Sequence, residues 1–303
     1  MYEDIIRRIQ ELNQKLIEHD VCIGGRGYYK VLDKMPFPDK KNIFFALSLE
    51  NKKQYLIEFA PQDLNPIDMQ KYLRRALFLM VLDQDKGVMS AKDFSIDPAR
   101  CFIITDWVEG KNLQSLMKHI RFQLPEILWI MSDLTYSLEH LSEFGFVHRN
   151  INPQNITIQA KTGRSYLGGV EYVTLSDFVH TRLEVNNHYA SPELVRSLLL
   201  PDNNEPLTPW SDIYSLGALF FHLVTGEPPF ASNRNIEKWC KSPNIPKIKS
   251  DFLTRRERKY CQELVDNTMH PKFLKRWTPN RIRRYIMAFL GESIKIEDMV
   301  RFL

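Results

Sequence analysis

The sequence predicts an α+β protein made of two lobes, a small β-rich lobe followed by a larger helical one. Two observations support this. Short apolar runs separated by turn residues fill the first third of the chain, as expected of strands. After Gly110 the apolar residues instead recur with helical periodicity over long stretches. Strands gathered ahead of helices, without regular alternation, are typical of an α+β layout.

Residues 1–27 form the first predicted segment, an amphipathic helix followed by a glycine-rich lead-in. Over residues 1–19, apolar residues recur at helical spacing with charges between them. This helix either packs on its own domain or binds a partner, and the sequence leaves both readings open. The residues that define the apolar stripe are Ile5, Ile9, Leu12 and Leu16.

Residues 28–107 form the predicted β-rich lobe. Apolar runs there are separated by turn residues, and one amphipathic helix lies between the third and fourth runs. The expected strands are residues 29–35, 43–49, 54–59, 88–94 and 102–107, and the expected helix is residues 66–82.

Residues 108–303 form the predicted helical lobe, with a short C-terminal tail. Helices are expected at residues 124–144 and 211–225, and more helices over residues 255–290. The basic clusters at residues 255–259 and 281–284, like the one at residues 74–75, are expected on solvated helix faces, with a dedicated anion site as the alternative.

The composition excludes several classes of protein. The net charge of +4 is too small to imply a nucleic-acid partner. No apolar run approaches the ~20 residues that a membrane-spanning helix needs, and no secretory leader is evident, so we expect a cytoplasmic protein without membrane insertion. The cysteines are scattered without a C-x-x-C pair, which favours core thiols over a zinc or redox site.

Ordered motifs occur in the second half of the chain. Residues 148–155 read H-R-N-I-N-P-Q-N, residues 176–179 read S-D-F-V, residues 191–193 read S-P-E, and residues 211–217 read S-D-I-Y-S-L-G. They resemble the H-R-D-x-K-P-x-N, D-F-G, A-P-E and D-x-x-S-x-G motifs of protein kinases. The chain therefore resembles the protein kinase superfamily from about residue 28 to residue 290, and Gly24-Gly25-Arg26-Gly27-Tyr28-Tyr29 resembles the lead-in of bacterial-type serine/threonine kinases. The resemblance implies the bilobal kinase fold.

The resemblance also implies two contacts that maintain this fold. Glu193 is expected to pair with Arg276, as the A-P-E glutamate of the family pairs with a late arginine. Asp212 is expected to hold the backbone at His148 and Arg149.

The residues that anchor ATP in the family are replaced. Glu58 occupies the position of the strand-three lysine, and its carboxylate would repel phosphate instead of binding it. The helix that should supply the partner glutamate has Arg75 or Ala76 at that position. We therefore expect a reversed ion pair between Glu58 and Arg75 that keeps the helix docked without nucleotide.

The glycine-rich loop of the family is also missing. Counting back from Glu58 places Pro36, Pro38 and Lys41 at the three glycine positions. Proline has no N–H to donate to a phosphate. In an alternative register, Gly25-Arg26-Gly27 would serve as the loop, which requires an extra strand before Glu58.

Two residues of the catalytic loop are degenerate. Asn150 replaces the aspartate that accepts the substrate proton, and a neutral amide cannot act as a general base. Asn152 replaces the lysine that steadies the transferred phosphoryl group.

Some positions with a nucleotide or metal role in the family remain. Asn155 and Asp177 stand at the magnesium positions, where they either bind a cation or persist as hydrogen-bonding structure. Thr105 stands at the gatekeeper position and Trp107 in the hinge, where the indole either fills the adenine cleft or packs in the core.

We therefore predict a pseudokinase that is not an enzyme and needs no cofactor. It would act as a scaffold or allosteric regulator that binds a protein, for example an active kinase. One alternative is an ATP-dependent transferase that uses Lys41, similar to the with-no-lysine kinases. The other is a sensor that binds ATP and magnesium through Asn155 and Asp177 without turnover.

Overall fold

The computed structural model describes residues 20–32, 42–61, 64–82, 86–97, 100–170, 173–175, 188–199, 207–229 and 242–293. The predicted N-terminal helix and C-terminal tail lie outside these residues. The chain divides into two compact units, and the division falls between Trp107 and Val108. Residues 86–88 belong to the second unit although they precede this point. The α+β architecture predicted from the sequence, with a β-rich and a helical lobe, is confirmed.

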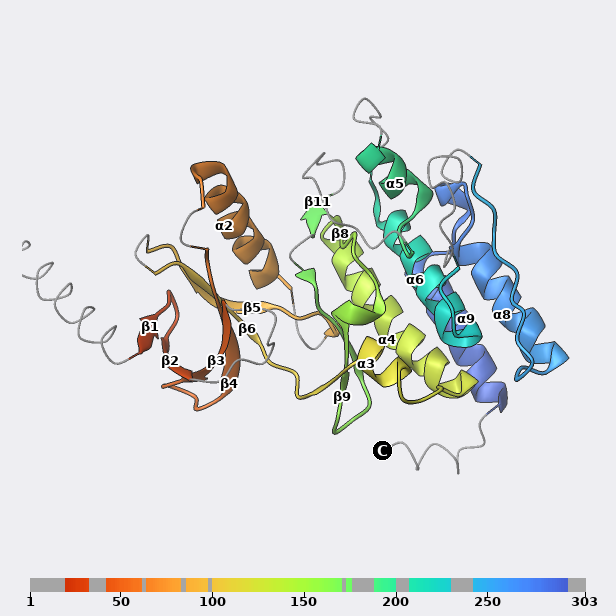
Figure 1. Ribbon diagram of the computed structural model, residues 1–303, viewed down its shortest axis with the longest axis horizontal. Coiled ribbons are helices and arrows are strands. Elements are labelled where there is room, and N and C mark those ends of the chain that lie inside the picture. Colours follow the sequence, from red (N-terminus) through yellow and green to blue (C-terminus); the bar gives the residue numbers. More distant parts are fainter. Residues whose placement is uncertain are drawn as a thin grey trace, which may run out of the picture. The chain divides into compact units, whose positions relative to one another are not determined.

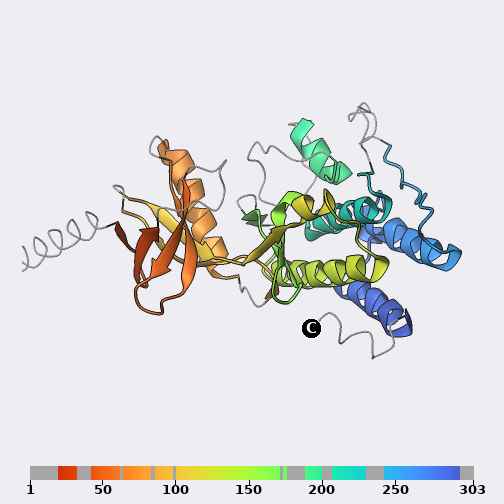
Figure 2. The same cartoon turned by 60° about the horizontal axis from the view of Figure 1, so that its bottom comes forward.

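The first unit is built on an antiparallel sheet with strand order β1-β2-β3-β4-β6-β5 among the described residues. Helix α2 (Pro66–Met80) contacts β5 of this sheet, as Figure 2 shows. Asn65 starts the helix, because its side chain accepts a hydrogen bond from the Asp68 N–H at 3.0 Å. The strands are β1 (Val21–Ile23), β2 (Tyr28–Leu32), β3 (Ile43–Ser48), β4 (Gln54–Phe59), β5 (Ala91–Ser95) and β6 (Phe102–Asp106).

Strand β1 corrects one boundary of our prediction, because residues 21–23 were expected in a lead-in outside the β-rich lobe. Instead β1 pairs with β2 and forms an edge of the sheet. The glycines between the two strands let the chain reach the other edge, where Gly25 N–H donates to Phe94 O at 3.2 Å. The sheet is therefore curled so that its two edge strands meet at one end.

Asp93, which is 1% exposed, joins these edges. One of its carboxylate oxygens accepts hydrogen bonds from Arg26 N–H at 2.8 Å and from Tyr29 O–H at 3.1 Å. A Cβ at Gly24 would lie 2.1 Å from the same oxygen. A side chain at Gly24 would displace this carboxylate, which gives the glycine-rich turn a structural role at the sheet edge.

Two apolar clusters pack on the sheet. Successive side chains of β4 point to opposite faces of the sheet and therefore belong to different clusters. Tyr55 and Ile57 lie in one cluster, and Leu56 lies in the other. Trp107 packs on the second cluster. Glu58 lies two residues after Leu56, so its side chain is on the same face of the sheet as Leu56 and points away from the first cluster.

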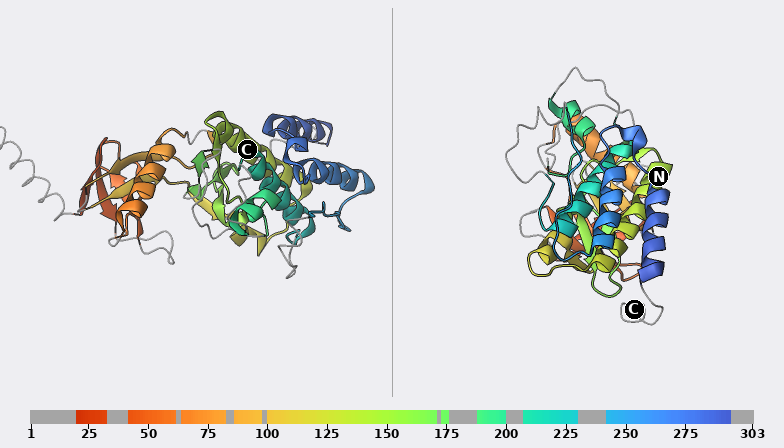
Figure 3. Two further views of the ribbon diagram at one scale, coloured as in Figure 1. Left: turned by 90° about the horizontal axis from the view of Figure 1, so that it is seen from above. Right: turned by 90° about the vertical axis from the view of Figure 1, so that its right-hand side faces the viewer.

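The second unit is mainly helical. Helix α4 packs against α6 and α9, and α6 packs against α8; Figures 1 and 3 show these helices running alongside one another. Proline near the start and Gly226 at the end, with φ of 86°, delimit α6. The helices are α3 (Leu113–Met117), α4 (Leu124–Glu143), α5 (Pro192–Leu199), α6 (Pro209–Thr225), α8 (Arg255–Thr268) and α9 (Pro279–Ser293), with 3₁₀ turns η2 (Pro153–Asn155) and η4 (Phe273–Lys275).

Short strands complete this unit. A small sheet has the order β10-β9-β7, and β8 pairs with β11. These pairs hold the segment that contains η2 between strands β8 and β9. Their bounds are β7 (Gly110–Asn112), β8 (Phe146–Val147), β9 (Ile156–Gln159), β10 (Ser165–Leu167) and β11 (Thr174–Leu175).

Two predictions from composition can be compared with the described residues. Cys22, Cys101 and Cys261 are unpaired and buried, as expected of core thiols. Burial raises the pKa of Cys22 to about 11 and that of Cys261 to about 12. None of the helices in the described ranges is both long and apolar enough to cross a bilayer.

Candidate functional site

A reversed ion pair joins Glu58 and Arg75, the two positions that the resemblance aligns with the ATP-anchoring lysine of kinases and its partner glutamate. Arg75 Nη2, on α2, lies 2.7 Å from Glu58 Oε1, on β4. Both side chains are mostly shielded from water, with 17% and 22% of their surface exposed. The pair was predicted from the sequence and is confirmed. Because the anion is on the strand and the cation on the helix, its polarity is opposite to that of the family's lysine–glutamate pair.

Tyr72 reinforces this contact between strand and helix. Its hydroxyl donates to the backbone oxygen of Glu58 at 2.7 Å, and the Arg75 guanidinium lies over its ring, 5.1 Å from the centroid. Burial raises the pKa of the Tyr72 hydroxyl, so it stays a hydrogen-bond donor. Helix α2 is therefore fixed to β4 by the chain's own side chains.

Asp212 holds the turn of the catalytic-loop segment. Its carboxylate accepts hydrogen bonds from His148 N–H at 2.6 Å and from Arg149 N–H at 2.8 Å. Arg149 has a φ of 67°, an uncommon conformation for a residue with a side chain, and these two bonds stabilise it. Burial raises the pKa of Asp212 to about 7, although both bonds and Arg149 oppose the shift. The predicted role of Asp212 is confirmed.

The asparagines of the catalytic loop bind one another. Asn152, which is 2% exposed, donates from its side-chain nitrogen to the side-chain oxygen of Asn150 at 2.7 Å. Its own side-chain oxygen accepts from Gln154 N–H at 2.9 Å. Asn152 is thus buried and engaged where the family has a lysine that reaches phosphate, and the amide of Asn150 is engaged where the family has a base.

Asn155 also has structural partners. Its side-chain nitrogen donates to the backbone oxygen of Asn150 at 2.7 Å. The side chain lies so close to Gly169, whose φ is 67°, that a Cβ there would approach it to 2.3 Å. This geometry supports the reading of Asn155 as hydrogen-bonding structure. Asp177, the other predicted metal ligand, lies outside the described residues, so the pair cannot be placed together.

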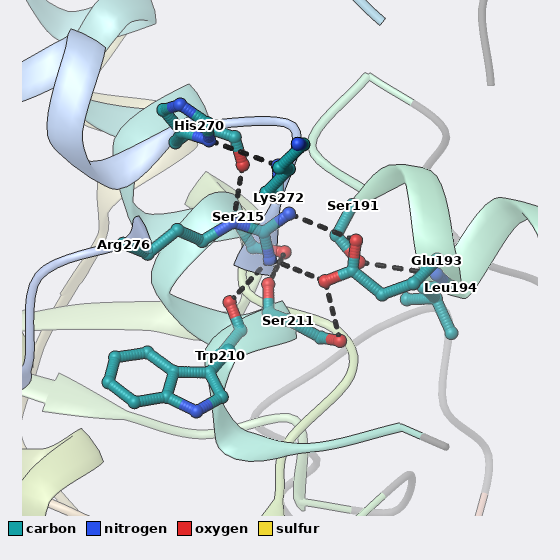
Figure 4. Close-up of polar contacts among 9 residues, drawn as sticks. All are labelled: Ser191, Glu193, Leu194, Trp210, Ser211, Ser215, His270, Lys272 and Arg276. Carbon is teal, nitrogen blue, oxygen red and sulfur yellow. Dashed lines mark hydrogen bonds and ion pairs between the residues drawn. The ribbon is translucent and has the colours of Figure 1, made fainter. Parts of the chain in front are cut away.

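The predicted pair of Glu193 and Arg276 is confirmed, and Figure 4 shows its surroundings. Arg276 donates both terminal nitrogens to the Glu193 carboxylate, one of them at 3.0 Å. Trp210 O and His270 O accept further bonds from the guanidinium at 2.8 and 2.9 Å, and Ser211 donates to Glu193 at 3.0 Å. The two ions are 1% and 3% exposed, and every charged atom of the pair has a partner.

The predicted adenine-side residues lie at the end of the first unit. Thr105 is half-buried on β6, paired with Leu56 in register. Trp107 packs edge-on against Phe45, with ring centroids 5.0 Å apart. This contact supports the reading of Trp107 as part of the core. Lys41, Pro36 and Pro38, which were aligned with the glycine-rich loop, lie outside the described residues.

Sequence reasoning missed two residues with structural roles, one in each unit. Asp93 joins the sheet edges, and Gly169 accommodates Asn155. Neither belongs to a motif that was recognised, and their partners are distant in sequence, so no local signal identified them. Among the described residues, no group of three His, Cys, Asp or Glu side chains could hold a metal ion.

Comparison with known proteins agrees with this geometry. The family model of the protein kinase domain matches residues 44–286. The chain is 25% identical over 268 residues to Citron Rho-interacting kinase of Homo sapiens, covering 83% of this chain and 13% of that protein. It is 26% identical over 208 residues to serine/threonine-protein kinase ATG1a of Arabidopsis thaliana, covering 66% of this chain and 32% of that protein.

A bacterial relative is similar to the same degree. Serine/threonine-protein kinase PrkC of Bacillus subtilis is 26% identical over 218 residues, covering 69% of this chain and 32% of that protein. The chain thus spans a third or less of the length of these curated relatives. The family model covers well over half of the chain, and the pairs made by Asp212 and by Glu193 have the partners expected of a kinase fold. The chain belongs to the protein kinase domain family.

Proposed function

We propose that this protein is a pseudokinase, a kinase-fold protein that binds another protein and does not transfer phosphate. The observation that carries the proposal is the ion pair between Glu58 and Arg75. Phosphoryl transfer needs a cation on this strand to hold the phosphate oxygens of ATP. Here the strand presents a carboxylate, and Arg75 on α2 pairs with that carboxylate at 2.7 Å.

The catalytic loop supports the same proposal. A kinase needs a carboxylate to orient the substrate hydroxyl and accept its proton. Asn150 offers an amide, and Asn152 hydrogen-bonds that amide instead of reaching toward a phosphate. The contacts that maintain the fold, by contrast, are intact at Asp212 and Glu193. Keeping the fold without the catalytic groups is the pattern expected of a binding module.

The partner is a protein, and an active kinase is the kind we favour. In this proposal no ATP or magnesium is needed, because the chain's own ion pair holds α2 against β4. The cytoplasm stays the location predicted from the sequence.

The test is phosphate transfer from labelled ATP with magnesium or manganese, to the protein itself and to a generic protein substrate. An active kinase assayed beside it gives the positive control. We expect no transfer above a reaction without protein. In parallel, thermal unfolding with millimolar ATP and metal should show no shift, whereas a ligand at 100 times its Kd would add about 2.7 kcal/mol of stability.

Two outcomes would replace the proposal. Transfer that is lost in Lys41→Ala would indicate a transferase in which that lysine holds the phosphates. A metal-dependent thermal shift without transfer, lost in Asp177→Ala, would indicate a nucleotide sensor. Glu58→Gln is the matched control variant in both experiments. It removes the carboxylate charge that would repel the phosphates of ATP, and it adds no positive charge that could bind them.

A further inference from the structure

An open groove of about 470 Å³ runs along α8, and Figure 1 shows this helix beside α6. We call it the α8 groove. One wall is the exposed face of α8, and the other is the segment around Ile248. The charged side chains that line it are Lys247, Arg255, Arg258, Lys259, Glu263 and Asp266.

Two of these cations have no counter-ion in the part of the chain that the structure describes. Arg255 and Lys259 are exposed and form no ion pair with any residue in the described ranges. They lie four residues apart, so they occupy the same face of the helix and repel each other. Arg258, by contrast, is engaged, because it donates to Ser250 O at 2.9 Å and to Leu253 O at 3.3 Å.

The position of these cations opposes the helix dipole. Arg255 is the first residue of α8, where the partial positive charge of the helix favours acidic side chains. The acidic residue of the first turn, Glu257, is used by the capping box, in which it accepts from Thr254 N–H at 2.8 Å and Thr254 O–H at 2.7 Å. A basic residue such as Arg255, which breaks this local rule and has no ion-pair partner among the described residues, indicates a functional surface.

The surrounding segment is strongly basic. Residues 247–259 contain six Lys or Arg and two Asp or Glu, an excess of +4, which equals the net charge of the whole chain. The other end of the groove is acidic. Asp266 lies 3.5 Å from Lys247, and Glu263 follows Lys259 by one helical turn. The groove therefore changes sign along its length.

We propose that the α8 groove binds a short acidic peptide segment of a partner protein. Arg255 to Asp266 spans about 16 Å of helix, which matches about five residues of extended peptide. Acidic side chains of the peptide would pair with Arg255 and Lys259, and a basic or neutral residue would face Glu263. The carboxylates of Glu263 and Asp266 at one end of the groove disfavour a uniform polyanion such as a nucleic acid. The proposal names the binding surface of the proposed protein-binding function and rests on it.

The test measures binding of the full chain to a fluorescent glutamate-rich peptide that ends in lysine. The Arg255→Gln/Lys259→Gln variant should bind at least about fivefold more weakly than the wild type, and added salt should weaken wild-type binding. The matched control is Lys272→Gln/Lys275→Gln, which removes the same charge from exposed positions at η4 and should bind within about twofold of the wild type.

Further comparisons decide the class of ligand. The same peptide with glutamine in place of glutamate should not bind. Equal weakening by the control variant would overturn the proposal, because it would mean non-specific charge attraction. Preference for an oligonucleotide or for anionic vesicles over the peptide would overturn it in favour of those ligands.

The two proposals can fail separately. No saturable binding of the peptide to the wild type would remove the α8 groove proposal and leave the pseudokinase proposal standing. Phosphate transfer by the wild type would overturn the pseudokinase proposal whether or not the peptide binds, because the assay does not depend on residues of α8.

Discussion

Arg75 and Glu58 meet at 2.7 Å across the contact between α2 and β4, with the charge signs of the kinase family exchanged. The same two positions can therefore hold the helix in place with either polarity. The exchange changes the sign of the charge on the strand at position 58. The contact between helix and strand is kept, whereas the cation that holds phosphate in kinases is lost.

The first prediction concerns this exchange. Glu58→Lys alone places two cations together and should destabilise the protein by about 1–3 kcal/mol, since a partly buried charge loses its partner. The double variant Glu58→Lys/Arg75→Glu should recover most of that loss. Urea unfolding followed by circular dichroism measures both. A double variant no more stable than the single one would show that the pair does not hold α2.

The second prediction concerns Glu193 and Arg276. Arg276→Ala leaves a buried carboxylate without its partner and should cost about 3–5 kcal/mol. Replacing both residues, as Glu193→Gln/Arg276→Ala, should cost less than the sum of the losses measured for Glu193→Gln and Arg276→Ala singly. Chemical unfolding tests this directly. Additive losses would mean that the two side chains contribute independently of each other.

The third prediction concerns Gly24. An alanine Cβ would lie 2.1 Å from the Asp93 carboxylate, which is fixed by its bonds to Arg26 and Tyr29. Gly24→Ala should therefore lower stability by about 1–3 kcal/mol. Gly291→Ala is the control, since a Cβ there meets nothing within 4 Å, and it should be neutral or stabilising by up to about 1 kcal/mol. Equal effects of both changes would contradict the proposed role of Gly24.

The fourth prediction concerns pH. Burial lowers the pKa of His222 below its usual 6.5, and its Nδ1 lies 2.6 Å from the Tyr189 hydroxyl. Burial also raises the pKa of Tyr189, so this hydroxyl donates and the imidazole accepts as a neutral ring. The groups whose charge acts on His222 include His188, which lowers its pKa, and Glu227, which raises it.

The sign of the effect follows from proton binding. As pH falls below 6.5, the unfolded chain protonates this histidine before the folded protein does, so the folded state loses stability. His222→Gln should show a smaller loss of stability over that range. Unfolding at a series of pH values compares the two proteins, with Tyr189→Phe as a second variant that removes the donor. An unchanged pH dependence in His222→Gln would contradict the prediction.

The sequence predicted those contacts whose partners both lie in recognisable motifs or in elements of clear register. Glu58 and Arg75 could be paired because, by the resemblance, they occupy the positions of the lysine and the glutamate that pair in protein kinases. Asp212 and Glu193 could be assigned because their motifs resemble those of kinases.

Other features required the structure. The register that uses Gly25-Arg26-Gly27 stayed open in the sequence because glycine alone does not say what approaches it. In the structure, the Asp93 carboxylate lies close to Gly24 and Gly25 and gives this turn a structural role. Asp93 shares no motif with the turn, so the contact could not be predicted from the sequence. Likewise the bond from Asn155 to the Asn150 backbone depends on the path of the loop, which residue types do not reveal.

We expect the two sheet edges that meet at Asp93 to come together late in folding. Strands β1 and β2 are neighbours in the chain and can form a hairpin early, but Arg26 and Tyr29 reach their acceptor only across 67 and 64 residues. Contacts this distant in sequence close slowly, because the loop entropy is lost before they form. The amides of edge strand β1 should therefore become protected from hydrogen exchange after those of β3, β4 and β6. In an Asp93→Ala variant, β1 should lose this protection before those strands do.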